Sequence, residues 1–356
     1  MKRSGAVLYL LLFFSSLSFS QFDNTDFLRS APVDATKIVQ AYIAPWANAF
    51  GAGLNGGWYN TAKPHKFGGF DITAGVSVGM VPSSGETFDL STLGLSSNIT
   101  YDSKITPTVA GIDEEGPNVQ YTVGGVKLAE FNTPPGSDWK YMPVPSLQVG
   151  IGLPFGTEIK GRFIPKIDIG DGDLSLWGVG LLHSITQYFP GNEMLPFDVS
   201  LFGGYTKLNA NVPINLAPDP SVVWNYSTYN VATSFEDQNL GIDITSLNVS
   251  AVASLNLPVV TFYGGMGYSK TKTEINLEGN FPTPTLNTTI PSSPYAEYAD
   301  KGVIAGEKFP SMEIKNFSGL RANIGIRFKL SVVTIHFDYT RAQYNILSSG
   351  LGLSFR

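Results

Sequence analysis

The chain has 356 residues, of which 43% are hydrophobic, 12% aromatic and only 15% charged, with 38 glycines, no cysteine and a formal net charge of −6. The lack of thiols excludes a disulfide scaffold, thiolate metal sites, a catalytic cysteine and a lipid anchor on cysteine. An acidic chain without a basic stripe is not expected to bind nucleic acid. The low charge and the high glycine and aromatic content indicate a β-rich protein whose outer surface meets something other than water.

The N-terminus has the pattern of an export signal. Lys2 and Arg3 precede the apolar run 6–14, and the small residues Ser18 and Ser20 stand before a cleavage point at Gln21. A membrane helix is the alternative, but the run is shorter than the ~20 apolar residues that a span needs. We therefore expect residues 1–20 to be a cleaved signal peptide and the protein to be exported.

Residues 21–66 are predicted to form a helical segment that lies at the periplasm or in the lumen of a barrel. Asp34 is a plausible N-cap, and apolar residues follow at helical spacing as far as Phe50, with a break or kink expected at Pro45. An apolar helix stripe must be buried against something, so a hatch in the lumen is favoured over a loose periplasmic tail. The predicted hatch residues are Trp46, Trp58, Tyr59 and Asn60.

Residues 67–356 alternate apolar and polar side chains with the two-residue period of β-strands that have one apolar face. A soluble sandwich shows the same alternation. The apolar stripes here, however, are long enough for the ~9–11-residue strands that cross a bilayer. Ten strands are predicted, and the insert 82–144 leaves room for a further hairpin at Val119 to Phe131, so that twelve or fourteen strands stay possible. The ten predicted ranges are about 67–81, 145–154, 156–168, 173–183, 197–212, 243–257, 260–279, 313–330, 332–342 and 344–356.

The connections between these strands differ in length in a regular way. Tight turns near Pro154, Pro258 and Ser331 fall on one side if the strands alternate in direction, and the long connections 82–144, 213–242 and 280–312 fall on the other. Short periplasmic turns and long outer loops are typical of outer-membrane barrels. The predicted fold is therefore all-β: a transmembrane antiparallel β-barrel of about 10–14 strands with a short N-terminal helical hatch, placed in the outer membrane of a Gram-negative bacterium among its lipids.

The C-terminal sequence SSGLGLSF resembles the assembly signal of outer-membrane barrels, with Gly350, Leu353 and Phe355 at the expected spacing. The resemblance implies that the barrel-assembly machinery recognises this last strand. Arg356 departs from the pattern, because it follows the aromatic residue that is usually terminal. Leu351, Leu353 and Phe355 are expected to face lipid, while the strand pairs with the first strand to close the edge.

The stretch GWYNTA, Gly57 to Ala62, is similar to the N-terminal hatch of FadL-type transporters of hydrophobic compounds. Those proteins carry Asn-Pro-Ala near this point, and Thr61 stands here in place of the proline. The layout of signal, hatch, barrel and long outer loops also resembles uncharacterised barrels of the Bacteroidota. FadL-type kinship would imply uptake of hydrophobic molecules by lateral passage through the barrel wall, and no substrate residue can be carried over.

Charged side chains on the polar faces of the strands are expected to point into the lumen. They can form cross-strand ion pairs that hold a narrow barrel together, or a polar seat for the hatch or a selectivity zone for anions. The predicted cluster consists of Glu158, Lys160, Arg162, Asp198, Arg321, Arg327, Lys329, His336 and Asp338.

Catalysis has little support in the sequence. The chain has three histidines, no His-Glu-x-x-His spacing, and no motif that fixes a nucleophile beside its base, so we expect no enzyme activity, cofactor or metal. Three functions remain. A channel or transporter for small solutes, hydrophobic ones included, requires an apolar pocket under the outer loops and a gap in the wall. A structural or adhesion barrel requires a filled lumen, and a general porin requires a wet pore.

Overall fold

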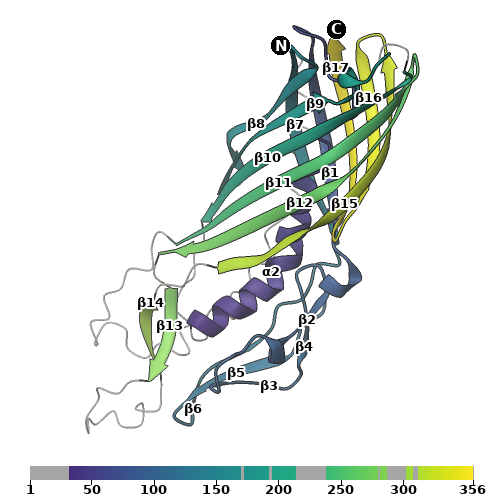
Figure 1. Ribbon diagram of the computed structural model, residues 1–356. Helices are drawn as coiled ribbons and strands as arrows, with labels where there is room; N and C mark the ends of the chain where they lie inside the picture. The colour runs from purple at the N-terminus through teal and green to yellow at the C-terminus, as the bar shows by residue number, and fades with distance from the viewer. Residues whose placement is uncertain are drawn as a thin grey trace, which may run out of the picture.

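The computed structural model describes residues 32–169, 172–191, 195–213, 238–279, 281–286, 302–307 and 312–355. The predicted signal peptide and Arg356 lie outside these residues. In the described part of the chain, ten antiparallel strands close into a barrel in the order β1-β17-β16-β15-β12-β11-β10-β9-β8-β7 (Figure 1), which confirms the ten predicted strands. Their bounds are β1 (Phe70–Met80), β7 (Tyr141–Leu153), β8 (Thr157–Ile169), β9 (Gly172–Ser184), β10 (Phe197–Pro213), β11 (Asn239–Asn256), β12 (Val260–Glu278), β15 (Met312–Leu330), β16 (Val333–Arg341) and β17 (Asn345–Phe355).

The first and last strands close the barrel as predicted. β1 pairs with β17 from Phe70 opposite Phe355 to Met80 opposite Asn345, and the rings of Phe70 and Phe355 stack at 4.9 Å. Leu353 and Phe355 point outward, whereas Gly350 faces inward beneath the imidazole of His336. No sheet edge is left between β1 and β17, which removes the unpaired backbone groups that an apolar solvent cannot satisfy.

The two ends of the barrel differ as the turn lengths predict. The tight connections 154–156, 257–259 and 331–332 lie at one end, which we call the short-turn end. The connection between β9 and β10 also lies there and contains the 3₁₀ turn η5 (Thr186–Tyr188). The opposite end, the long-connection end, carries the insertion 81–140, the ends of β10 and β11 and of β12 and β15 that flank the two other long connections, and the short connection 342–344 (Figure 1).

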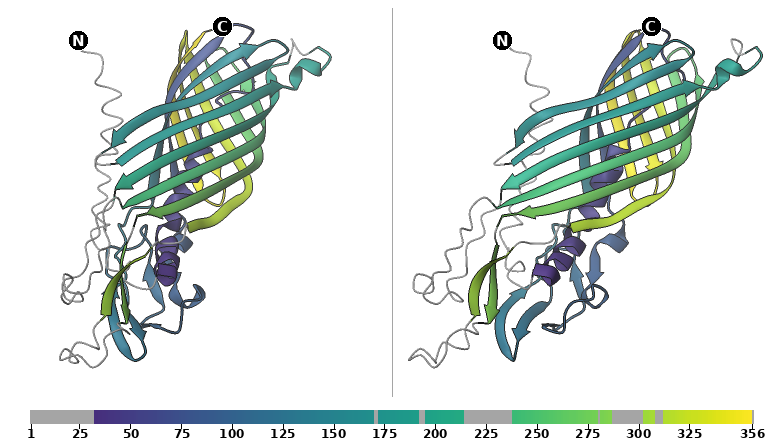
Figure 2. Two further views of the ribbon diagram at one scale, coloured as in Figure 1. Left: turned by 90° about the vertical axis from the view of Figure 1, so that its left-hand side faces the viewer. Right: turned by 60° about the vertical axis from the view of Figure 1, so that its left-hand side comes forward.

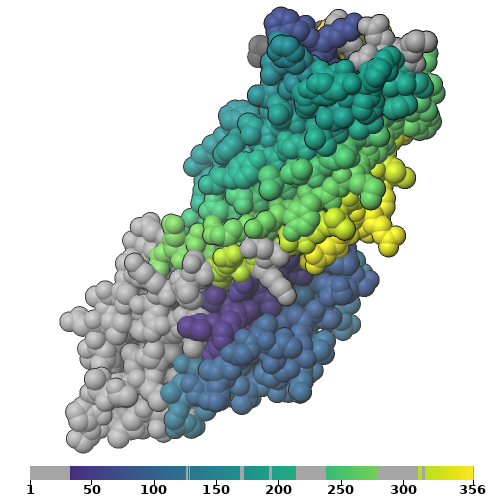
Figure 3. Space-filling view, viewed as in Figure 1, coloured from purple at the N-terminus to yellow at the C-terminus, as the bar shows by residue number. Residues whose placement is uncertain are grey.

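The insertion 81–140 forms a cap over the long-connection end (Figure 3). The predicted hairpin at Val119 to Phe131 is present as β5 and β6, but it pairs with β3 in a separate sheet and does not join the barrel wall. Residues 281–307 contribute a further strand pair, β13–β14. The elements outside the barrel are η3 (Ser83–Gly85), β2 (Thr87–Asp89), η4 (Leu90–Thr92), β3 (Ile99–Tyr101), β4 (Ile105–Pro107), β5 (Asn118–Val123), β6 (Val126–Asn132), β13 (Phe281–Leu286) and β14 (Gly302–Glu307).

Helix α2 (Pro32–Leu54) runs from this cap into the barrel (Figure 1). It is continuous through Pro45, so the expected break is absent. Asp34 lies inside the first turn and accepts hydrogen bonds from Ser96 N (3.0 Å) and Ser96 Oγ (2.5 Å), so the prediction that it is the N-cap is wrong. Among the described residues, no helix is long and apolar enough to span a membrane.

The two halves of α2 are buried by different partners. Its first half packs against the cap and the rim of the barrel, where Tyr42 donates to Pro135 O (2.8 Å) and burial raises the pKa of Tyr42 to about 12, with nearby Asp113 adding to the effect. Its second half lies against β1, where a Cβ on Gly79 would come within 1.9 Å of Ala49 O. Only glycine at position 79 therefore lets the helix approach the wall this closely.

The polarity of the two barrel faces reverses along the strands. Near the short turns, large apolar side chains such as Leu201 and Val249 point outward and small polar ones such as Ser200 and Ser250 point inward. Toward the long connections, Leu208 and Ile244 are buried inside, while Lys207 and Asp243 face outward and lie 4.0 Å apart. The register between β10 and β11 is unbroken, so the reversal lies in the sequence and not in a bulge.

Candidate functional site

All nine predicted lumenal charges lie on the inner face of the wall. Asp198 and Lys329 are partly exposed near the short-turn end, and Asp198 lies 3.9 Å from Lys63. The other seven are buried: Glu158, Lys160, Arg162, Arg321, Arg327, His336 and Asp338.

Two of these arginines hold the chain that follows α2, residues 55–66, which we call the plug strand. Arg162 donates from its two terminal nitrogens to Leu54 O (3.0 Å) and Gly56 O (2.7 Å), and from Nε to Gln148 Oε1 (3.0 Å). Gln148 in turn donates to Trp58 O (3.2 Å). From the opposite wall, Arg321 donates to Asn55 O (2.7 Å). The backbone carbonyls after the helix end are thereby satisfied in the lumen, where no other strand pairs with them.

Trp58, Tyr59 and Asn60 make side-chain contacts with three different parts of the wall. The Trp58 ring packs on Phe202 (5.6 Å between centroids), and the Arg162 guanidinium stacks over it at 3.8 Å. A Cβ on Gly180 would come within 2.9 Å of this ring, so the indole rests directly on wall backbone. Tyr59 donates to Asn323 Oδ1 (2.8 Å), and Asn60 Nδ2 lies 3.4 Å from His336 Nδ1. Trp46, the fourth predicted hatch residue, lies on α2 and donates to Trp139 O (2.9 Å).

An ion cluster fixes the end of the plug strand at the short-turn end. His65 N and Nδ1 lie 2.8 and 2.9 Å from Glu158 Oε2, and His65 Nε2 lies 3.0 Å from Ser354 Oγ. His65, Asp71 and Glu158 offer ligand atoms within 4.8 Å of one another, a set that a divalent cation can use. Lys160 already supplies a positive charge there, bonded to Glu158 and 4.0 Å from Asp71 Oδ1.

An apolar cavity of about 200 Å³ lies at the long-connection end, between α2 and the wall. It is lined by the apolar residues that face inward beyond the polarity reversal. The lining passes from Met142 on β7 to Leu174 on β9, and none of the described β8 residues takes part in it. Trp46 and Phe50 of α2 form the inner wall, and the remaining apolar side chains are Ile43, Ala47, Val109, Leu208, Ala210, Val212, Leu240, Ile242, Ile244 and Ile275.

In the part of the wall beside this cavity, β7 and β8 are not paired with each other. Within the described residues, the two strands pair only from Leu153 opposite Thr157 to Gln148 opposite Arg162. Beyond this last rung β7 continues to pair with β1, and β8 continues along β9 with a bulge between Ile164 and Ile167. β8 accordingly diverges from β7 toward the long connections (Figures 1 and 2). We call this stretch the seam.

Prolines explain why the pairing stops. Gly152 N donates to Gly69 O, and Lys140 O accepts from Val81 N, so the even residues of β7 bond to β1 and the odd ones face β8. Pro143 and Pro145 are odd, and they therefore lack the N–H groups that would reach β8. Extending the observed register would place Pro145 opposite Pro165 of β8, with neither able to donate.

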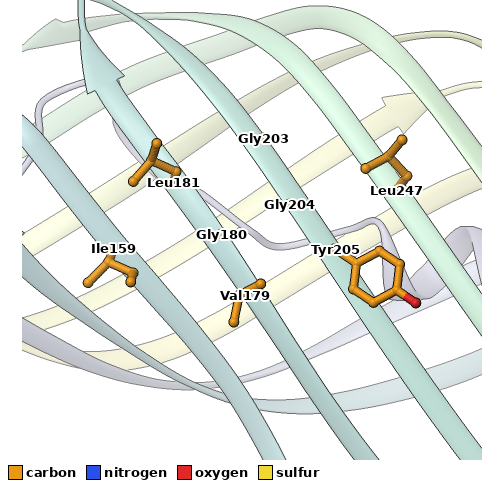
Figure 4. A pocket seen from close by; sticks show the side chains of 8 residues that line it. All are labelled: Ile159, Val179, Gly180, Leu181, Gly203, Gly204, Tyr205 and Leu247. Carbon is orange, nitrogen blue, oxygen red and sulfur yellow. The ribbon is translucent and has the colours of Figure 1, made fainter.

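A second apolar hollow, of about 340 Å³, lies on the outer face of the wall (Figure 4). Ile159, Val179, Leu181, Tyr205 and Leu247 surround it, and Gly203 leaves it open because it has no side chain. Trp58 packs against the inner side of the same wall region, at Gly180 and Gly204. The hollow is therefore separated from the lumen by backbone and an indole ring, and it does not communicate with the inner cavity.

The model of a protein family described as a family of unknown function, DUF6588, matches residues 1–355. The chain belongs to this family. No curated protein matches the sequence.

Among solved structures, the chain is similar to three bacterial proteins at low TM-scores. Ail, the attachment invasion locus protein of Yersinia pestis, aligns with a TM-score of 0.27 and 9% identity over 81% of this chain and 98% of that one. The translocator domain of the autotransporter NalP from Neisseria meningitidis gives 0.29 and 10% over 82% and 89%. The outer membrane protease OmpT from Escherichia coli gives 0.30 and 6% over 81% and 97%. Likeness at this level carries no argument about function.

Sequence reasoning named an apolar pocket and a gap in the wall only as requirements of a transporter and did not identify the residues of either, although both leave a signal. On β11 the apolar residues near the long connections, Leu240, Ile242 and Ile244, have even numbers and face inward, while those from Leu247 to Leu255 are odd and face outward, with Val252 as the exception. The change of parity within one strand marks the boundary between the two lumen environments. The prolines of β7 and β8 are equally visible, but their meaning depends on which neighbour each backbone N–H faces.

Proposed function

We propose that the protein is an outer-membrane barrel that binds small hydrophobic molecules in the apolar cavity and admits them sideways from the membrane through the seam. The observation that carries this proposal is the position of the cavity directly behind the unpaired part of the wall, lined on one side by Met142 of β7 and on the other by Leu174 of β9. An apolar molecule dissolved in lipid can reach such a site without crossing water.

The outer surface supports the membrane location. Large apolar side chains project outward from all ten wall strands of the described chain, and an outward charged belt lies above them, with Lys272 2.5 Å from Glu274 and 3.7 Å from Glu313. An apolar band bordered by charge is the surface of a barrel that crosses a bilayer. Extraction from membranes only by detergent, together with gel mobility that changes on heating, is the expected behaviour. Release by salt or alkali would contradict it.

The size of the cavity suggests the ligand class. Dry apolar cavities of about 150 Å³ hold one benzene-sized molecule. The cavity here, at about 200 Å³, suits one or two rings or a short alkyl segment, with the rest of a longer molecule in the seam. The lining includes Asp173 and Asn211 at one edge, where Asn211 Nδ2 donates to Asp173 Oδ1 (3.1 Å); this carboxylate can accept from a ligand hydroxyl but would repel a ligand carboxylate.

The resemblance of GWYNTA to the hatch of FadL-type transporters supports the same function. In this chain the stretch lies in the lumen, with Trp58 and Tyr59 buried against the wall. We propose that the plug strand separates the cavity from the short-turn end and must shift before a ligand can pass. A general porin is less well supported, because the carbonyls of Leu54, Asn55, Gly56 and Trp58 are hydrogen-bonded to wall side chains in the lumen.

Binding of N-phenyl-1-naphthylamine, whose fluorescence rises in apolar surroundings, tests the proposal. The full mature chain is placed in lipid nanodiscs, and the signal of empty nanodiscs is subtracted. We expect one saturable site per chain. Ala47→Phe and Ala210→Phe each fill the cavity from a different wall and should abolish that component, whereas Val249→Phe adds the same ring on the outward face and should leave it unchanged.

The outcome that would overturn the proposal is a saturable signal that is the same in Ala47→Phe, Ala210→Phe and Val249→Phe, or no signal above empty nanodiscs. In that case the second candidate, a structural or adhesion barrel with a closed lumen, is favoured. The specific observation behind this candidate is the filled short-turn half, where Trp58, Phe202, Leu182 and Tyr263 pack together inside the wall.

A further inference from the structure

The last rung of the seam has two roles. Gln148 and Arg162 are the final paired residues of β7 and β8 before the strands separate. The same two side chains hold the plug strand, through Leu54 O and Gly56 O on Arg162 and through Trp58 O on Gln148. A further hydrogen bond, from Arg162 Nε to Gln148 Oε1 (3.0 Å), joins the two across the seam. We call this four-bond arrangement the clasp.

The clasp contacts both the plug strand and the point where β7 and β8 separate. Its side chains are buried, with 5% of Gln148 and 4% of Arg162 exposed, so neither can replace a lost partner with bulk water. Outward of it the register of β7 and β8 has no further paired residues, and Pro145 and Pro143 cannot donate toward β8. Inward of it the ladder is complete as far as Leu153 and Thr157.

We infer that the seam and the plug strand are mechanically coupled through the clasp: opening the wall by one more rung releases the plug strand, and displacing the plug strand loosens the wall. The link to ligand passage rests on the proposed function, because the seam is the proposed entrance. The coupling itself requires no ligand. A molecule that parts Gln148 from Arg162 removes at the same time the donors that hold Leu54 O, Gly56 O and Trp58 O, so entry and opening of the lumen become a single step.

Arg321 provides the contrast within the same lumen. It holds Asn55 O from β15, which is paired with β12 at Arg321 and on both sides of it, while the β15–β16 ladder begins at the next residue, Ala322 opposite Arg341. It also donates to Thr340 Oγ1 (3.3 Å) on β16. Loosening this contact frees one carbonyl of the plug strand, whereas the clasp holds the carbonyls of Leu54, Gly56 and Trp58. Coupling is therefore expected to be stronger at the Arg162 side, by reciprocity of linked equilibria.

Amide hydrogen exchange of the full chain in nanodiscs, without added ligand, tests the inference. Gly56→Ala displaces the plug strand without changing a residue of β7 or β8, because its Cβ would come within 2.7 Å of Ser77 Oγ and 2.8 Å of Ser348 Oγ, on β1 and β17. The displaced Gly56 peptide loses its bond to Arg162. We expect exchange to accelerate about tenfold or more in residues 147–153 and 157–163 as well as in the plug strand, since hydrogen bonds to a charged group are lost.

Tyr59→Phe is the matched control. It removes the plug bond to Asn323 Oδ1 on β15 and leaves the clasp untouched. Exchange should rise near residue 59 and stay at the wild-type rate in residues 147–153. If Gly56→Ala accelerates exchange in the plug strand while both seam segments keep the wild-type rate, the coupling is refuted.

A disulfide lock gives the reverse measurement and does not depend on Gly56→Ala folding. The chain has no cysteine, so the pair Leu147→Cys/Phe163→Cys, one rung beyond the clasp, forms the only possible bridge. Oxidation should slow exchange of residues 54–58 about tenfold relative to the reduced form. The pair Ile151→Cys/Ile159→Cys, inside the closed ladder, should change nothing. Failure of the first pair to cross-link, or equal exchange in its two forms, would overturn the inference.

The two proposals fail separately. Amide exchange is measured without ligand. If the seam and the plug strand prove to be uncoupled, binding of N-phenyl-1-naphthylamine can still be intact, and only the further inference fails. If N-phenyl-1-naphthylamine does not bind, the exchange data can still show coupling, and only the proposed function fails.

Discussion

The two halves of the lumen are built by opposite rules. At the short-turn end most inward side chains of the wall are polar or charged, apart from the apolar cluster around Trp58, and β7 and β8 are paired. Arg162 of β8 holds the carbonyls of Leu54 and Gly56. Asn55 O is held by Arg321 from the other wall. At the long-connection end the inward side chains are apolar, β7 and β8 are apart, and the cavity remains.

The comparison teaches that one strand can serve two environments. β10 and β11 keep their register throughout, yet their apolar side chains move from the outer to the inner face. Where lipid would surround the wall, the outside is apolar and the lumen is filled by hydrogen bonds. Where the wall rises above that band, the outside is charged and the apolar side chains turn inward against α2, as in a water-soluble core.

The largest effect is expected from removing the plug anchor. Trp58→Ala deletes a fully buried ring and should lower the free energy of unfolding by about 3–5 kcal/mol. Unfolding in urea from detergent measures it. Trp177→Ala removes the same side chain from the outward face, where 46% is exposed, and should cost clearly less. Equal losses would mean that the plug strand does not stabilise the short-turn half.

The second-largest loss of stability is expected when a polar side chain is introduced into the apolar lumen at the long-connection end. Leu208→Asn buries an amide among apolar cavity residues and should destabilise by about 2–3 kcal/mol, because its donors and acceptor find no partners. The matched change is Thr206→Val, two residues away on the same inner face, whose buried Oγ1 has no hydrogen-bond partner. It should be neutral or slightly stabilising. Unfolding in urea measures both variants. If Leu208→Asn and Thr206→Val change the free energy of unfolding equally little, the contrast between the two halves of the lumen is wrong.

Closing the seam should have a moderate effect on stability and a clear one on kinetics. Pro145→Val/Pro165→Val restores the two N–H groups that the extended register would pair, at roughly 0.5–1.5 kcal/mol for each hydrogen bond formed. The double variant should be more stable and should take up N-phenyl-1-naphthylamine more slowly in stopped-flow fluorescence. Its equilibrium signal should be unchanged, because the cavity lining is intact.

Pro143→Val is the control for the seam variant. It restores one N–H two residues farther from the paired ladder than position 145, so it should change the entry rate little. An unchanged entry rate in Pro145→Val/Pro165→Val, with slower amide exchange at the seam, would show that molecules enter by another route.

The smallest effect concerns the cap. Tyr42→Phe removes the hydrogen bond to Pro135 O and should cost about 0.5–1.5 kcal/mol, measured by amide exchange of residues 105–136. Because folding raises the pKa of this hydroxyl from 10.0 to about 12, its stabilisation is complete below pH 10 and is lost as the pH rises through about 12. Wild type should thus approach Tyr42→Phe above pH 11. A gap that stays constant with pH would contradict this account.

Much of the fold could be predicted from the sequence, and less of the site. Period-two alternation located the ten wall strands, and the same period placed all nine lumenal charges on the inner face, including Arg162 and Arg321. Turn lengths gave the two ends. The helix was found, but Asp34 was misplaced as its N-cap because its actual partner, Ser96, lies 62 residues away in the cap. Local signals cannot anticipate a partner that only folding brings near.

The sequence by itself determined a closed wall, since a two-faced strand of this length is stable only when each backbone group is paired and each face meets its own solvent. The tertiary structure alone decided where that wall opens. Pro145 and Pro165 can be read from the sequence, but only the strand register shows that they would lie opposite each other. Only the position of the plug strand shows that Gln148 and Arg162, joined by a hydrogen bond, also hold another segment. Hydrogen bonding between remote segments depends on parity and position across strands, and a one-residue slip would reverse both.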